Sequence, residues 1–187
     1  FICWCFAHYP DCKFLYISHS FDLATIHTSS IKQTMSMPIY RQLFGVEIRR
    51  ESSAKDHFET TAGGAVKAFG SQGGITGHDA GLPGQPRFTG GVVIDDIHKP
   101  EEIHSDSIRE RIQRNYFETI ERRPRAPNVP IILIGQRLHE ERGRFVLHRP
   151  DAGQACGRQG NPGDGLLQEF GDGTVEVDHH LGGETRI

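Results

Sequence analysis

Short runs of consecutive apolar residues alternate along this chain with segments of helical spacing. The apolar runs cover residues 14–17, 92–94 and 131–134, and polar side chains follow each of them. Such continuous runs are typical of strands that are buried on both faces, as in a parallel sheet. Between them, residues 21–37 and 105–123 have helical patterns, with Ser20 and Ser105 placed to cap the helix starts. The pattern predicts an α/β fold built from βαβ units.

The remaining stretches give weaker predictions. Residues 1–8 are typical of the end of an apolar helix, residues 39–44 of one more helical turn, and residues 65–69 of a strand. Residues 46–59 are charged and poorly patterned, and they receive no assignment. Residues 60–91 are rich in glycine, so we expect loop outside the strand there. In the helix at 105–123, one face is formed by four apolar side chains that repeat every four residues: Ile108, Ile112, Tyr116 and Ile120.

The character of the chain changes after Glu141. Residues 1–141 are predicted to form one incomplete domain, whereas residues 142–187 are rich in glycine and arginine and lose their apolar periodicity. Low-complexity composition of this kind favours a disordered tail. The abruptness of the change supports a second hypothesis, that a reading-frame shift produced the tail. Translation of the encoding DNA in the other two frames tests it.

Composition narrows the function classes. The net charge of -3 gives no overall attraction to nucleic acid, so any contact with DNA has to be local. No apolar run reaches the roughly 20 residues of a membrane span, so we expect no membrane partner. The spacing of the four cysteines matches no zinc pattern. We expect reduced thiols in a cytoplasmic protein.

The candidate chemistry lies where the predicted strands end. The polar sets are Ser-His-Ser at 18–20, Asp95 with Asp96, and Gln136 with Arg137. In open α/β sheets, ligands bind beyond the carboxyl ends of the strands, so these sets are expected to line one edge. We predict that Asp95 holds Mg²⁺ and that Asp96 orients or deprotonates the water that attacks a γ-phosphate. Gln136 or Arg137 would sense that phosphate.

Other interpretations of these residues have to be weighed. An Asp-Asp pair after a strand is also common as a helix cap or a solvated turn. The phosphate-binding pattern G-x-x-x-x-G-K-[ST] does not occur in the sequence, and the glycine pairs lack the spacing of a dinucleotide fingerprint. The histidines are too dispersed to predict a metal site. The arginines of the helix at 105–123 alternate with glutamates, which favours a solvated face over a DNA contact.

Five segments carry a resemblance to a known family. In chain order they are Leu-Tyr-Ile-Ser-His-Ser at 15–20, Thr-Thr-Ala-Gly-Gly at 60–64, Gly-Ile-Thr-Gly at 74–77, Val-Val-Ile-Asp-Asp-Ile-His-Lys-Pro at 92–100, and Ile-Ile-Leu-Ile-Gly-Gln-Arg-Leu-His-Glu at 131–140. Together they resemble the ATPase domain of the large terminase subunit of tailed bacteriophages. The segments follow the family's order, and the resemblance covers residues 1 to about 141.

The resemblance implies a fragment of a motor that uses ATP and Mg²⁺ to move double-stranded DNA into a procapsid. Asp95 matches the Walker B aspartate and Asp96 the catalytic acidic position, where many P-loop motors have glutamate. Gln136 and Arg137 match the motif that couples hydrolysis to DNA movement. The implied protein partners are the small terminase subunit and the portal protein, in the cytoplasm of a bacterial host.

The implied fold is a partial parallel-sheet P-loop-type ATPase domain that lacks its Walker A strand and loop and carries an irregular C-terminal tail. We expect the phosphate-binding loop to precede Phe1 in the parent protein and a nuclease domain to follow Glu141. Two alternatives stay open. One is a non-catalytic prophage remnant that still binds the portal or small-terminase partners. The other is a helicase-type ATPase, which would need a second motor domain.

Overall fold

The computed structural model describes residues 1–102, 104–135, 169–170 and 174–175. The chain divides into two compact units, Phe1–Gln136 and Arg137–Ile187. In the second unit, the described residues form two short antiparallel strands, β7 (Glu169–Phe170) and β8 (Thr174–Val175). All candidate chemistry in the described residues belongs to the first unit.

The first unit alternates helices and strands in the order that the apolar pattern predicts. Its elements are α1 (Ile2–His8), β1 (Lys13–Ser18), α2 (Phe21–Ser36), α3 (Pro38–Phe44), β2 (Ile48–Ser53), β3 (His57–Thr60), β4 (Ala65–Gly70), β5 (Gly90–Asp95), η1 (Pro100–Glu102), α4 (Asp106–Glu118), η2 (Ile120–Arg122) and β6 (Ile131–Ile134). The strands predicted at 14–17, 65–69, 92–94 and 131–134 are therefore all present. The charged stretch at 46–59, which received no assignment, forms β2 and β3.

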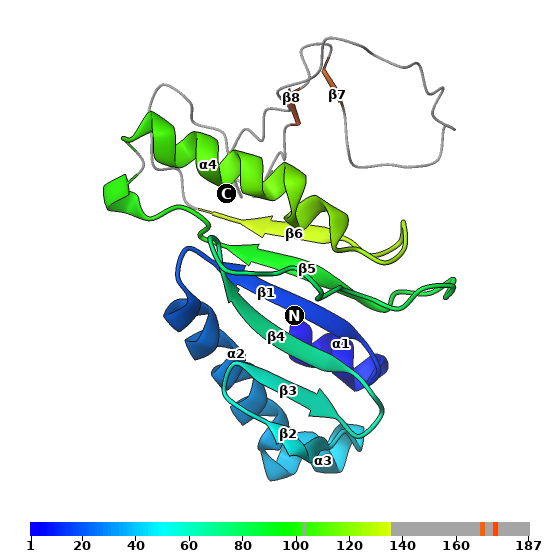
Figure 1. Ribbon diagram of the computed structural model, residues 1–187. Coiled ribbons are helices and arrows are strands. Elements are labelled where there is room, and N and C mark those ends of the chain that lie inside the picture. The colour runs from blue at the N-terminus through cyan, green and yellow to red at the C-terminus, as the bar shows by residue number, and fades with distance from the viewer. Residues whose placement is uncertain (103, 136–168, 171–173, 176–187) are drawn as a thin grey trace, which may run out of the picture. The chain divides into compact units, whose positions relative to one another are not determined.

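Six strands make one mixed sheet with the order β2-β3-β4-β1-β5-β6 (Figure 1). The four strands β4, β1, β5 and β6 run parallel to one another, which confirms the predicted parallel core. The strands β2 and β3 extend the sheet as an antiparallel pair beside β4. The central strand β1 thus has parallel neighbours on both sides.

The helix ends follow from local chemistry. The Ser20 hydroxyl accepts a hydrogen bond of 3.2 Å from the Leu23 amide, which confirms Ser20 as the cap of α2. Helix α3 ends at Gly45, whose φ of 66° suits a residue without a side chain. Ser105 stands at the cap position of α4, but its side chain makes no capping hydrogen bond. Helix α4 also ends at Glu118, earlier than predicted, and a 3-10 turn follows.

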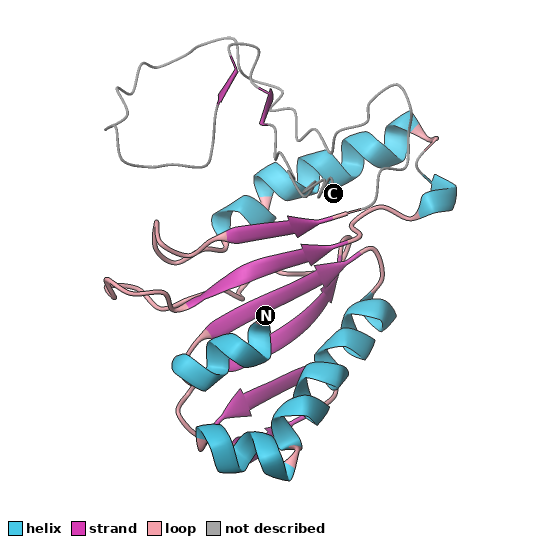
Figure 2. Cartoon of the chain, turned by 180° about the vertical axis from the view of Figure 1, so that it is seen from behind, coloured by secondary structure: helices cyan, strands magenta, loops and turns pink. Residues whose placement is uncertain are grey.

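Both faces of the central strands are buried. Helices α1 to α3 lie over one face (Figure 2), where Phe14 and Tyr16 of β1 pack with Val93 of β5. Side chains alternate between faces along a strand, so Ile17 and Ile94 point to the opposite face. Both are fully buried there. The strong apolar character of β1 and β5 is thereby explained, because neither strand has a solvent-facing side.

The third predicted strand differs from expectation. We predicted that residues 131–134 form a buried strand, but β6 is half-buried, and the side chain of Ile134 is 49% exposed. The reason is its position, because β6 is the last strand in the sheet order and pairs with β5 alone among the described strands. An apolar run identifies a strand here but does not place it inside the sheet.

Three of the four cysteines lie among the described residues, and Cys3, Cys5 and Cys12 are free thiols. Cys5 of α1 and Cys12, which precedes β1, are buried in the core. Burial is the main cause that raises the pKa of Cys12 to about 12 from an ordinary value of 9.0. Burial likewise raises the pKa of Tyr40 to about 12. Both groups therefore keep their protons well above neutral pH in the folded chain.

These raised pKa values predict a loss of stability in alkali. Below about pH 8, both states keep the protons, so stability does not change through these groups. As pH rises above the unfolded values, the unfolded chain releases protons that the folded chain retains, and each group lowers the free energy of unfolding by up to about 1.4 kcal/mol per pH unit. Urea unfolding at pH 8, 9, 10 and 11 measures the slope. Cys12→Ala should flatten it, and an equal slope in that variant would contradict this account.

Within the described ranges, no helix combines the length and the apolar character required to cross a membrane.

Candidate functional site

The carboxyl ends of the parallel strands meet at one edge of the sheet, which we call the carboxyl edge. Ser18 ends β1 and is the register partner of both Gly70, which ends β4, and Asp95, which ends β5. Asp95 is in turn the partner of Ile134, which ends β6. Figure 1 shows the arrows of β5 and β6 pointing the same way. The predicted meeting of the Ser18 and Asp95 sets at one edge is confirmed.

The third predicted set is Gln136 and Arg137. Both residues fall outside the residues that the structure describes, so their roles stay predictions. The structure does describe β6, the strand that leads to them. Its pairing with β5 is parallel and puts Ile134 level with Asp95.

Two ring side chains contact the Asp95 carboxylate. The Tyr16 hydroxyl donates a hydrogen bond of 2.6 Å to Oδ2. The Nε2 atom of His27, from α2, lies 3.8 Å from the same oxygen. The rings of Tyr16 and His27 stack with their centroids 5.5 Å apart. In the described part of the chain both contacts of this carboxylate fall on Oδ2, so Oδ1 is available as an acceptor.

The Tyr16 phenol is a donor in this contact. Burial raises the pKa of Tyr16 above its ordinary value, and the hydrogen bond to Asp95 and the negative charge of that carboxylate raise the pKa further. The hydroxyl therefore carries its proton at neutral pH, and it can only donate to an ionised carboxylate. The hydrogen bond thus runs from the protonated phenol of Tyr16 to the Asp95 carboxylate.

A second oxygen donor lies next to Asp95. Ser18 is fully buried, and its Oγ makes no hydrogen bond among the described residues. Register partners in a parallel pair place their side chains on the same face, so Ser18 and Asp95 share a face. A buried hydroxyl without a partner costs about 1–3 kcal/mol, and such a cost is common where a ligand supplies the partner. Carboxylate and hydroxyl oxygens are hard donors, so this pair fits Mg²⁺.

Asp96 takes an unusual backbone conformation. Its φ of 43° makes it the single residue other than glycine with a positive φ in the described ranges. Aspartate tolerates this region better than most residues. The Asp96 amide donates to the Ile134 carbonyl at 3.0 Å, and its own carbonyl accepts from the His19 amide at 3.0 Å. The backbone of Asp96 therefore ties the ends of β1, β5 and β6 together, while its side chain is half-exposed.

A second connection joins the carboxyl edge to α4. The Ser71 amide donates to the Ser18 carbonyl at 2.7 Å, and the Ser71 hydroxyl donates to the His19 carbonyl at 3.3 Å. The Asn115 side chain from α4 then donates to the Ser71 carbonyl at 2.5 Å. This chain of hydrogen bonds fixes the start of the glycine-rich loop against β1.

Sequence reasoning missed four residues of this arrangement: Tyr16, His27, Ser71 and Asn115. A signal existed for Tyr16, because it lies two positions before Ser18 and therefore on the same face of β1. His27, Ser71 and Asn115 carry no such signal, since their places depend on how the elements pack.

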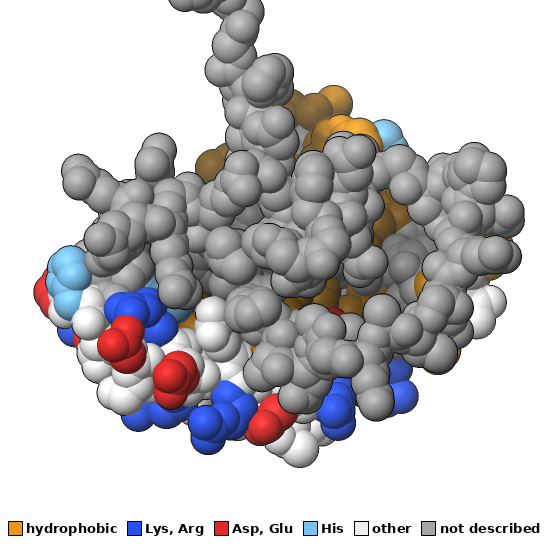
Figure 3. All heavy atoms as spheres, turned by 90° about the horizontal axis from the view of Figure 1, so that it is seen from above, with side chains coloured by type: hydrophobic (Ala, Val, Ile, Leu, Met, Phe, Trp, Pro, Cys, Tyr) orange, Lys and Arg blue, Asp and Glu red, His pale blue; other side chains and the backbone are white. Residues whose placement is uncertain are grey.

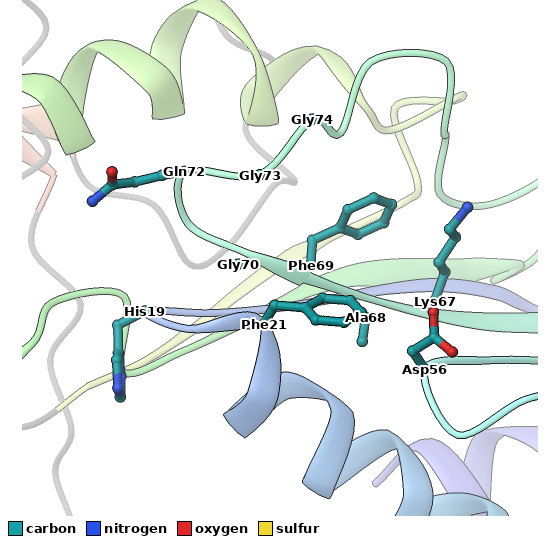
Figure 4. A pocket seen from close by; sticks show the side chains of 10 residues that line it. All are labelled: His19, Phe21, Asp56, Lys67, Ala68, Phe69, Gly70, Gln72, Gly73 and Gly74. Atoms are coloured by element: carbon teal, nitrogen blue, oxygen red, sulfur yellow. The ribbon is translucent and has the colours of Figure 1, made fainter.

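A cavity of about 410 Å³ opens beside the carboxyl edge, between the end of β4 and the start of α2 (Figure 4). Phe21 and Phe69 form its apolar centre. Lys67 and Asp56 lie at one end, and His19 and Gln72 at the other. The Lys67 ammonium already has a partner, because its Nζ lies 3.0 Å from the Nε2 of His78. The cavity is thus an apolar recess with polar ends rather than a phosphate cradle.

The arginine-rich helix does not present a surface of one sign. Figure 3 shows basic and acidic side chains interspersed on this side of the molecule. Arg109 pairs with Asp106 one turn earlier in α4. The expectation of a solvated, charge-paired face agrees with this pairing.

Within the residues that the structure describes, no group of three histidine, cysteine or acidic side chains is close enough together to hold a metal ion. His139, His179 and His180 lie outside those residues. Comparison with protein-family models gives no match for this chain, and a search of curated proteins gives none either.

Proposed function

We propose that this chain is a fragment of the ATPase domain of a phage large terminase subunit, the motor that moves double-stranded DNA into a procapsid. The observation that carries the proposal is the pair Asp95 and Asp96 at the end of the interior parallel strand β5. Its two neighbours, β1 and β6, end level with it. In an open α/β sheet this is the edge at which ligands bind.

The proposal gives the carboxyl edge the metal half of a nucleotide pocket. Asp95 would hold Mg²⁺ through Oδ1, and the Ser18 hydroxyl next to it would supply a second oxygen or bind a metal-bound water. A Mg²⁺ ion held there would supply positive charge against the phosphates of ATP. The phosphates themselves require a glycine-rich loop with a lysine, and that pattern is not found in the sequence.

The other predicted residues would act on the attacking water and on the coupling of ATP hydrolysis to DNA movement. The Asp96 carboxylate is half-exposed and makes no hydrogen bond or ion pair in the described residues, so it is available to accept a proton from water. The backbone hydrogen bonds of Asp96 fix its place relative to β6. Gln136 and Arg137, which follow β6, would link the state of the nucleotide to DNA movement, as the family resemblance implies.

A second candidate is a non-catalytic fragment that binds a protein partner, such as the portal or the small terminase subunit. The observation that favours it is a set of exposed apolar side chains on α1, α2 and α3. Exposed apolar groups of this kind mark interaction surfaces when they are contiguous. The set comprises Trp4, Ile26, Ile39, Leu43 and Phe44.

The proposal predicts that this chain alone hydrolyses Mg-ATP no faster than the buffer does, with or without double-stranded DNA. The physical reason is that Asp95 would position a cation, whereas the sequence lacks the G-x-x-x-x-G-K-[ST] loop that would bind the triphosphate. A colorimetric phosphate-release assay measures the rate. Robust turnover that is lost on Asp95→Ala would refute the need for a separate phosphate loop, and turnover that survives Asp95→Ala would refute the proposed function itself.

The nucleotide sequence upstream of the region that encodes this chain distinguishes the motor fragment from the non-catalytic fragment. An open reading frame that encodes G-x-x-x-x-G-K-[ST] supports the motor, and co-expression of that segment should restore ATP hydrolysis that depends on Asp95. A decayed upstream region supports the non-catalytic fragment.

A further inference from the structure

The hydroxyl of Tyr16 makes the shortest side-chain contact to the Asp95 carboxylate. The 2.6 Å separation of Oη and Oδ2 is typical of a strong hydrogen bond to a charged acceptor. The two residues come from neighbouring strands and are 79 positions apart in the chain. Because Tyr16 is 7% exposed and belongs to the main core cluster, its hydroxyl cannot follow a moving carboxylate.

Packing fixes the position of the Tyr16 ring. His27 stacks on it at an interplanar angle of 29°, and the ring lies between β1 and α2. The terminal torsion of an aspartate side chain is otherwise broad, so an unrestrained carboxylate rotates easily. A rigid donor on one oxygen removes that rotation.

We propose that Tyr16 is a positioning residue for Asp95, one that occupies Oδ2 and thereby presents Oδ1 to a divalent cation. The inference rests on the proposed function in one respect, that Asp95 binds such a cation. Hydrogen bonds to ligating carboxylates orient them, and loss of one such partner typically weakens metal binding by about 10–100-fold.

Tyr40 provides a matched control for a purely structural role. It is also 7% exposed, it belongs to the same core cluster, and its hydroxyl donates a hydrogen bond of 2.6 Å to the Cys3 carbonyl. Its hydroxyl contacts a backbone carbonyl of α1 instead of Asp95. Tyr16→Phe and Tyr40→Phe therefore remove the same atom from equally buried rings.

The test is a Mn²⁺ titration of the full chain, with the electron paramagnetic resonance signal of free Mn²⁺ as the readout. Tyr16→Phe should raise the dissociation constant about 10-fold or more. Tyr40→Phe should leave it unchanged, although both variants should unfold at similarly lowered temperatures. Equal affinities in Tyr16→Phe and the unmodified chain would overturn the positioning role.

Asp95→Asn in the same titration separates this inference from the proposed function. If Asp95→Asn abolishes binding while Tyr16→Phe does not weaken it, the positioning role fails and the cation site stands. If Asp95→Asn binds Mn²⁺ as the unmodified chain does, the cation site and the inference both fail.

A measurement on the unmodified chain covers the case in which Tyr16→Phe does not fold. With ¹³C-labelled tyrosine, saturating Mg²⁺ should shift the ring signal of Tyr16 and leave that of Tyr40 in place. If the Tyr16 signal does not change at saturating Mg²⁺, the Tyr16 hydroxyl does not position Asp95 for a cation.

Discussion

Gly90→Ala should abolish stable folding of the first unit or lower its free energy of unfolding by about 4 kcal/mol or more. Gly90 begins β5 with a φ of 133°, a conformation that alanine rarely adopts. A Cβ atom there would overlap the Lys13 carbonyl oxygen and lie 2.7 Å from the Lys13 nitrogen. Those atoms are backbone of the neighbouring strand β1 and cannot move aside as the end of a flexible side chain can.

The effect matters for the site because Gly90 and Lys13 are the first register pair between β1 and β5. The same register sets Asp95 level with Ser18. Urea unfolding followed by circular dichroism measures the change in stability. Gly74→Ala is the matched control, since a Cβ atom at Gly74 meets nothing within 4 Å. Equal stabilities of Gly90→Ala and Gly74→Ala would contradict the claim that the backbone of β1 leaves no room for a Cβ atom at Gly90.

The apolar runs predicted the parallel core because burial on both faces leaves no polar position in a strand. The interior strands β1 and β5 have this composition, as predicted. The prediction that β6 is buried was wrong, because an edge strand that covers an apolar face has the same composition as an interior one. It gave no assignment for β2 and β3, where half-buried and exposed positions carry charged side chains.

The carboxyl edge was predictable in outline and not in its contacts. The direction of parallel strands alone requires Ser18 and Asp95 to end at the same edge. The stacking of His27 on Tyr16 and the bridge from Asn115 to Ser71 depend on how α2 and α4 pack against the sheet. Packing of that kind leaves no periodic trace in a sequence.

The backbone of Asp96 is a further feature that the sequence did not predict. We expected its carboxylate to serve catalysis, and that role stays a prediction. The structure adds that its positive φ allows one residue to pair with both Ile134 and His19. Glutamate lacks the short side chain that tolerates this conformation.

Asp95→Asn should remove the stabilisation of this chain by divalent cations. A ligand at a hundredfold excess over its dissociation constant stabilises the folded state by about 2.7 kcal/mol. For a domain of this size, that raises the unfolding midpoint by roughly 5–10 °C. The amide of asparagine keeps the shape of the side chain and loses the charge, so the gain on addition of Mg²⁺ or Mn²⁺ should disappear.

Thermal unfolding with increasing MnCl₂ measures the gain. Glu110→Gln, an equivalent loss of charge at an exposed position of α4, is the control and should keep the full gain. A gain that persists in Asp95→Asn would mean that the cations bind elsewhere on the chain.

The central claim is that the carboxyl edge of this sheet is a cation site built on Asp95. The most direct measurement is X-ray diffraction from crystals of the full chain soaked in Mn²⁺, with data collected at the manganese absorption edge. We predict an anomalous difference peak within bonding distance of an Asp95 carboxylate oxygen, on the side not occupied by Tyr16. A peak elsewhere in the molecule, with none at Asp95, would contradict the claim.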